Sequence, residues 1–207
     1  MFGKSVKLFK LFGFEVKVDW SWLILGALIV WSLATGPFRS SSPGLDPADY
    51  WIMGVAGAIG LFLSIVFHEF WHSFVARRFG LDMKGITLFL FGGVSEMGDE
   101  PPNPGSEFFL ALAGPVSSVI LAALLLGLTA LLGGPGVSSP VVGVLRYLAL
   151  LNFILAGFNL LPAFPLDGGR VLRAVLWGAW NDLRRATRVA ASIGGLLGGA
   201  LMVLGAL

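Results

Sequence analysis

The 207-residue sequence contains no cysteine, only two histidines and few charged residues. The absence of cysteine excludes both disulfides and thiolate metal sites. Charged residues make up 13% of the chain, against about 25% in ordinary globular domains. Hydrophobic residues make up 56%, and the net charge of +2 gives no indication of nucleic-acid binding. This composition predicts an integral membrane protein.

Both histidines lie in one motif, His68-Glu69-Phe70-Trp71-His72, which follows 17 uncharged residues from Trp51 to Phe67. On a helix, positions i and i+4 share a face, so His68 and His72 can bind one metal ion. Glu69 lies about 100° around the helix, where a carboxylate can act as general base without being a ligand. The alternative is a pair of hydrogen-bonded core histidines beside a surface carboxylate. Membrane depth favours the metal site, because a carboxylate without a role or partner is costly there.

A catalytic zinc usually takes three protein ligands. With no cysteine and no third histidine, the third ligand must be Asp or Glu. Asp167 is favoured, because it follows an apolar run and lies in a segment broken by prolines and glycines, where a carboxylate can turn inward. Glu96 is the next candidate, and Asp167 could instead cap a helix that starts at Gly168. The other carboxylates fall in predicted surface segments, in the polar loop or at the exposed end of a span: Glu15, Asp19, Asp46, Asp49, Asp82, Asp99, Glu100, Glu107 and Asp182.

Apolar stretches predict an all-α polytopic membrane protein with five to six transmembrane helices, since a helical span takes about 20 residues. We place the spans at about residues 20–36, 50–79, 108–132, 141–161 and 189–207, within a single membrane-embedded core. Val16 and Val18 alternate with charged residues, which suits a short strand. Residues 85–94 are apolar but too short to span, and Gly92 and Gly93 indicate a tight turn. We therefore expect a small β or re-entrant element near the active site.

The distribution of basic residues predicts the orientation of the chain. With the N-terminus inside, residues 1–19, 77–105 and 165–188 are cytoplasmic and hold 12 of the 14 Lys and Arg. This asymmetry predicts that the N-terminus and the site opening face the cytoplasm. The layout and the lack of targeting signals favour a multi-pass protein of a prokaryotic plasma membrane.

Two separated motifs, His68-Glu69-x-x-His72 and Asn159-x-x-Pro162-x-x-x-x-Asp167-Gly168, resemble the site-2 protease family of intramembrane zinc metalloproteases. The stretches Phe91-Gly92-Gly93-Val94 and Ala113-Gly114-Pro115 also resemble that family, and the resemblance covers nearly the whole chain. It implies one Zn²⁺ per chain, with His68, His72 and Asp167 as ligands and Glu69 as the catalytic base. It also implies that Asn159 binds substrate or an intermediate.

The resemblance further implies hydrolysis of peptide bonds in or near the transmembrane segment of membrane proteins, as in regulated intramembrane proteolysis. The expected partners are a single-span transmembrane substrate and the lipid bilayer, with no nucleic acid. The stretch Gly85–Val94, including Gly92 and Gly93, is expected to hold an extended substrate by strand addition. Related prokaryotic members with this N-terminal layout commonly have six spans and then a CBS pair. The chain is therefore expected either to miss a C-terminal helix and a regulatory domain or to be a natural short form. No stretch is long enough for an inserted PDZ domain.

Three alternatives belong to other classes or use another ligand. A metal transporter would place ligands along a path on several helices, whereas here the polar groups reduce to one compact site. A non-catalytic metal-binding membrane protein would not need Glu69. A membrane zinc protease with a Glu ligand from a soluble loop is the nearest enzymatic rival.

Overall fold

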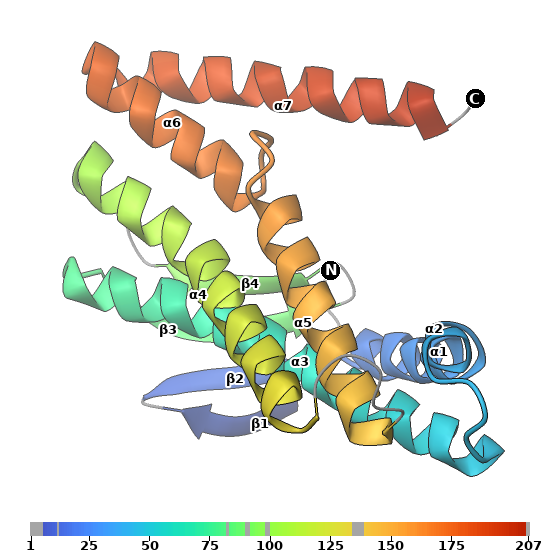
Figure 1. The fold of residues 1–207 in the computed structure, drawn as a ribbon. Helices are drawn as coiled ribbons and strands as arrows, with labels where there is room; N and C mark the ends of the chain where they lie inside the picture. The colour runs from blue at the N-terminus through green and yellow to red at the C-terminus, as the bar shows by residue number, and fades with distance from the viewer. Residues whose placement is uncertain are drawn as a thin grey trace.

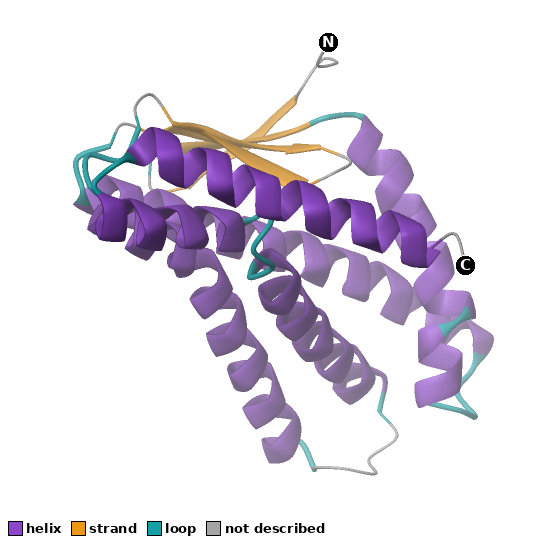
Figure 2. Ribbon diagram, turned by 90° about the horizontal axis from the view of Figure 1, so that it is seen from above, coloured by secondary structure: helices purple, strands orange, loops and turns teal. Residues whose placement is uncertain are grey.

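The computed structural model describes residues 6–11, 13–81, 83–89, 92–97, 100–133 and 139–205. Within these residues the chain forms helices α1 to α7 and one small sheet, whose strands gather on one side of the helices (Figure 2). Five helical segments are long and apolar enough to cross a membrane: Ser21–Ser41, Pro47–Arg78, Pro104–Leu131, Pro140–Asn159 and Leu183–Gly205. This architecture confirms the predicted fold class of five to six membrane helices with a small β element.

The helices that carry most of the buried surface are α3 (Pro47–Arg78), α4 (Pro104–Leu131) and α5 (Pro140–Asn159). Figure 1 shows α4 and α5 side by side across α3, with α6 (Asp167–Trp180) leading into α7 (Leu183–Gly205), which crosses above them. Helix α1 (Ser21–Thr35) packs against α3 and continues into the short helix α2 (Pro37–Ser41). Residues 37–41 are therefore helical, although their proline and serine content indicates a loop.

Proline marks the start of four helices, which explains why they begin where they do. Pro37, Pro47, Pro104 and Pro140 each stand in the first turn of a helix, where the missing N–H is no loss and the fixed φ suits the helix. Helix α4 also has a capping box, in which Asn103 accepts from the backbone N–H of Ser106 and the Ser106 side chain accepts from that of Asn103. Consequently α4 begins four residues earlier than the apolar pattern indicates, and it takes in Glu107.

The sheet is larger than the sequence indicates, with four strands in the order β1-β2-β3-β4. Strands β1 (Val6–Leu11) and β2 (Phe14–Val18) form an antiparallel hairpin, and β2 pairs in parallel with β3 (Met83–Phe89). Strand β4 (Gly92–Met97) pairs antiparallel with β3 and forms one edge. The side chains of Phe14 and Val16 are buried against α3, which attaches the sheet to the helix that bears both histidines.

The pairing corrects the expectation that the whole stretch Gly85–Val94 forms an exposed edge. Strand β3 is paired on both sides, so its backbone hydrogen-bonding groups are already engaged. Of the two strands in this stretch, β4, which begins at Gly92 and Gly93, lies at an edge of the sheet and is open to a further strand. Gly92 and Gly93, expected to form a tight turn, lie in the strand instead, and residues 90–91 fall outside the described residues.

Helix α6 begins earlier than the prolines and glycines of residues 162–169 indicate. Its first residue is Asp167, and Gly168 and Gly169 lie in its first turn. A Cβ at Gly168 would collide with the backbone of Leu160 and Leu161, and one at Gly169 would lie 2.7 Å from the carbonyl carbon of Ala163. The two glycines are therefore needed because the first turn of α6 lies directly against the segment that precedes it.

Candidate metal centre

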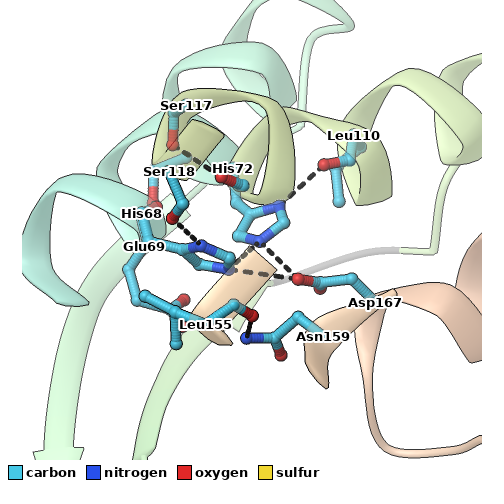
Figure 3. Close-up of polar contacts among 11 residues, drawn as sticks. His68, Glu69, His72, Leu110, Ser117, Ser118, Leu155, Asn159 and Asp167 are labelled. Atoms are coloured by element: carbon cyan, nitrogen blue, oxygen red, sulfur yellow. Dashed lines mark hydrogen bonds and ion pairs between the residues drawn. The ribbon is translucent and has the colours of Figure 1, made fainter. Parts of the chain in front are cut away.

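The two histidines of the motif project from one face of α3 into the interior of the helices. The side chains of His68 and His72 are buried, with 3% and 4% exposure, and their Nε2 atoms lie 3.2 Å apart. The sequence predicted this convergence, because four residues span little more than one helical turn. Figure 3 shows both rings turned toward the same point.

Helix α4 fixes the orientation of both imidazole rings. Nδ1 of His72 lies 2.7 Å from the backbone carbonyl oxygen of Leu110, and Nδ1 of His68 lies 2.9 Å from Oγ of Ser118 (Figure 3). A carbonyl oxygen can only accept, so Nδ1 of His72 carries the hydrogen and Nε2 of the neutral ring keeps its lone pair. Metal-binding histidines are held in this way by the hydrogen bond of the other ring nitrogen.

The first residue of α6 completes the cluster. Oδ2 of Asp167 lies 3.1 Å from Nε2 of His68 and 3.1 Å from Nε2 of His72. The three atoms thus form a nearly equilateral triangle with sides of 3.1, 3.1 and 3.2 Å. Ligands about 2.1 Å from a tetrahedral zinc would lie roughly 3.4 Å apart, so the triangle is close to the size that such an ion requires.

The chemistry of these three atoms calls for a cation at their centre. A carboxylate oxygen and a neutral imidazole Nε2 both offer lone pairs, and lone pairs at about 3 Å repel unless a proton or metal ion lies between them. Burial raises the pKa of Asp167, but a proton shared with Nε2 of His68 and His72 takes the place of such a cation and holds that pKa well below its usual range. Asp167 is therefore an anion at neutral pH, as a metal ligand must be.

A glycine on α4 leaves the space that an ion would occupy. A Cβ built on Gly114 would collide with the Nε2 atoms of both His68 and His72. Any side chain at this position would therefore fill the centre of the cluster. Among the described residues, His68, His72 and Asp167 are the only such group of three that could hold a metal ion.

Glu69 lies beside the cluster without joining it. Figure 3 shows Glu69 next to His68, which precedes it in the chain. Within the described part of the chain its carboxylate makes no hydrogen bond, and only its backbone oxygen is engaged, by the hydroxyl of Ser73. A carboxylate with free lone pairs close to a metal site can accept a proton from water.

Where the structure describes them, the other residues predicted for the site make no hydrogen bond with the three clustered side chains. Asn159 ends α5 near Asp167 (Figure 3), and its side-chain N–H donates to the carbonyl of Leu155 at 2.9 Å. Gly92 and Gly93 begin the edge strand β4, opposite Phe89 and Leu88. The side chain of Glu96 lies outside the described residues. Asp167 does not serve as an N-cap, since that position belongs to Leu166.

Sequence reasoning missed the residues of α4 that support the cluster. Ser118 and the carbonyl of Leu110 contact the two imidazole rings, and the same helix carries a buried carboxylate at Glu107. Glu107 was assigned to the polar loop, because the capping box that starts α4 ahead of it was not recognised. Gly114 entered the sequence analysis only through the Ala113-Gly114-Pro115 resemblance. A glycine inside a helical pattern can also indicate that another group packs closely against the helix, which here would have pointed to the imidazoles.

Comparison with known proteins places these features in a family. The sequence profile of Peptidase family M50 matches residues 56–140 and 134–202. "Putative zinc metalloprotease Rip3" of Mycobacterium tuberculosis is 40% identical over 201 residues, which cover 97% of this chain and 51% of that protein. A zinc metalloprotease of Methanocaldococcus jannaschii is 34% identical over 98% of this chain and 54% of its own length. The chain thus spans about half the length of these curated relatives.

A solved structure agrees with the sequence comparison. The site-2 protease from Methanocaldococcus jannaschii matches 98% of this chain and 85% of its own, with a TM-score of 0.63 and 32% identity. The match covers nearly the whole of this chain, including its five long apolar helical segments, so the chain is a multi-pass membrane protein. Both comparisons confirm the resemblance seen in the two motifs: the chain belongs to peptidase family M50, the site-2 protease family.

Proposed function

We propose that this chain is a zinc metalloendopeptidase that hydrolyses peptide bonds in or near the transmembrane segments of membrane proteins. The observation that carries the proposal is the triangle formed by His68 Nε2, His72 Nε2 and Asp167 Oδ2, with the unengaged carboxylate of Glu69 beside it. The relatives named zinc metalloproteases support the choice of zinc. One Zn²⁺ per chain would be held by His68, His72 and Asp167.

The chain's own residues divide the chemistry among them. When bound, zinc supplies a Lewis acid that brings the pKa of a coordinated water to about 7 and polarises a carbonyl oxygen. Glu69 accepts the proton of the attacking water and then gives it to the leaving amine. A positioned general base of this kind contributes typically about 10²–10⁴-fold to the rate. Ser118 and the Leu110 carbonyl keep both imidazole rings in place during the reaction.

A substrate must be extended to be cleaved, because a helix hides its peptide bonds in internal hydrogen bonds. The edge strand β4 supports binding by strand addition, in which the backbone of Gly92 and Gly93 would pair with the substrate. The side-chain oxygen of Asn159, which has no hydrogen bond within the described residues, would accept from a substrate N–H. The proposed substrate is a single-span transmembrane protein.

The distribution of Lys and Arg supports a cytoplasmic N-terminus and a site that opens toward the cytoplasm of a prokaryotic cell. We further propose that residues 1–207 form one membrane-embedded core. The orientation of the chain in the membrane is tested with single cysteines introduced at Ser40 and at Asp182. Each variant is treated with a thiol reagent that does not cross membranes. Labelling of Asp182→Cys only in inverted vesicles, and of Ser40→Cys only in whole cells, is expected.

The function itself is tested by cleavage of a single-span membrane protein by the purified chain in detergent. Wild type is expected to cut the substrate, and both a zinc chelator and Glu69→Gln are expected to abolish the cut. Zinc is counted in each sample. A Glu69→Gln protein that keeps its zinc and still cleaves would remove Glu69 from the mechanism, whereas wild type without zinc would overturn the metal site.

A further inference from the structure

Helix α4 carries a buried carboxylate that the proposed chemistry does not use. Glu107, in the first turn of α4, has no exposed surface. Nε of Arg173, on α6, donates to Oε1 of Glu107 at 2.7 Å, and Nη2 of Arg173 contacts the same oxygen. Nε of Arg170 lies 3.9 Å from that oxygen. These ion pairs link α4 to α6.

A buried ion pair of this kind adds little to stability by itself. Taking both charges out of water costs several kcal/mol per ion, and replacing such a pair by apolar residues is often neutral or stabilising. What a buried pair does provide is a unique register, because a carboxylate without its partner is costly in every other docking position. The Glu107–Arg173 pair therefore determines where along α4 the helix α6 can lie.

The register of α6 matters because Asp167 is its first residue. Arg173 lies six residues after Asp167, a rise of about 9 Å on a rigid helix. The guanidinium of Arg173 also lies 5.5 Å from the ring of Phe164, in the segment that leads into Asp167. Arg173 thus contacts α4 on one side and the residues just before Asp167 on the other.

The same face of α4 supports both histidines. Glu107, Leu110, Gly114 and Ser118 follow one another at intervals of three or four residues and are all buried. Leu110 and Ser118 orient the imidazole rings, and Gly114 leaves the central space. One face of α4 thus contacts the imidazole rings of α3 and, through Glu107, Arg173 of α6.

We propose that Glu107, acting through Arg173, is a positioning residue that places the Asp167 carboxylate within reach of both imidazoles. It touches neither the metal site nor a substrate. Its effect is to fix the docking of α6, so that Oδ2 of Asp167 meets the two Nε2 atoms. This inference rests on the proposed function, since it assumes that the three residues bind zinc.

The first test compares metal binding by Glu107→Gln, Arg173→Gln and a matched control, Arg184→Gln, in the full chain. Arg184 is an exposed arginine at the start of α7 with no ion pair among the described residues. The dissociation constant for Zn²⁺ and the visible absorption spectrum of bound Co²⁺ are measured for each. Both Glu107→Gln and Arg173→Gln are expected to weaken zinc binding roughly 10- to 100-fold, as loss of a supporting residue does, and to change the Co²⁺ spectrum. Arg184→Gln is expected to match wild type.

A purely structural role for the pair would give a different result. It would lower the melting temperature of the metal-free protein while leaving the zinc affinity and the Co²⁺ spectrum unchanged, and that outcome would overturn the proposal. The double variant Glu107→Gln/Arg173→Gln is expected to bind zinc better than the sum of the two single losses predicts, since both single variants remove the Glu107–Arg173 contact. Additive losses would also contradict the proposal.

The conservative variant Arg173→Lys keeps the test decisive if the Gln variants do not fold. It keeps a positive charge opposite Glu107 and leaves the Arg170 contact in place, so zinc affinity is expected to stay near the wild-type value. A folded Arg173→Lys protein that binds no zinc would overturn the inference. If wild type itself binds no zinc, the proposed function fails; if wild type and Glu107→Gln bind zinc alike, only the positioning role fails.

Discussion

Nδ1 of His72 lies 2.7 Å from the backbone carbonyl oxygen of Leu110, whereas Nδ1 of His68 lies 2.9 Å from the side-chain hydroxyl of Ser118. The two imidazoles are therefore held by different means. The acceptor for His72 belongs to the backbone of α4 and persists under any substitution at position 110. The partner of His68 is a side chain, so its contribution can be measured by mutation.

Replacing Ser118 by Ala is expected to weaken zinc binding roughly 10- to 100-fold, because the orientation of the His68 ring is no longer fixed. The matched control is Ser117→Ala, since the hydroxyl of Ser117 donates to the carbonyl of Gly114 in its own helix at 2.7 Å. Competition with a chromophoric chelator measures both affinities. Equal losses in the two variants would show that the Ser118 contact has no special role.

Replacing Gly114 by Ala is expected to abolish zinc binding, because the added methyl group would occupy the space between the Nε2 atoms of His68 and His72. Gly127→Ala, in the same helix, is the control, since its Cβ would have no neighbour within 4 Å. That control is expected to retain zinc and to gain up to about 1 kcal/mol of stability from the higher helix propensity of alanine. Elemental analysis measures the zinc content of both variants, and thermal unfolding measures their stability. A Gly114→Ala protein with a full complement of zinc would mean that the ion lies elsewhere.

The identity of the third ligand is tested by comparing Asp167→Ala with Glu96→Ala. The first is expected to lose bound zinc and the second to keep about one ion per chain, since Oδ2 of Asp167 lies 3.1 Å from both imidazoles. Zinc is counted after gel filtration in buffer without added metal. The opposite pattern would assign the ligand to Glu96, the alternative that the sequence left open.

Removing zinc is expected to lower the melting temperature, because the ion would join α3 to α6 only in the folded state. A ligand present at about 1,000 times its dissociation constant stabilises the folded state by about 4.1 kcal/mol. Thermal unfolding with and without chelator measures the difference. In a His68→Ala/His72→Ala variant the chelator is expected to have no effect, and a similar shift there would point to a second metal site.

Local sequence features were sufficient for much of this description. The four-residue spacing of His68 and His72 places them on one helical face in any fold that keeps the helix. Long apolar runs identify membrane helices, because only segments with satisfied backbone groups and apolar side chains cross a bilayer. Helix boundaries were less accurate. The capping box at Asn103 starts α4 four residues before the apolar pattern indicates, and α6 begins at Asp167, one residue before the helix start at Gly168 that the sequence suggested.

The sequence by itself determined the membrane helices and the pair of histidines, and it narrowed the third ligand to a few carboxylates. Those features depend on composition and on spacing within one helix. Only the tertiary structure decided the parallel pairing of β2 with β3, the edge position of β4 and the contacts of Ser118 and Glu107 with distant residues. Each of these joins residues more than 45 positions apart or depends on which strands are neighbours. Their positions are set by how the helices and strands pack, for which no local pattern in the chain provides a signal.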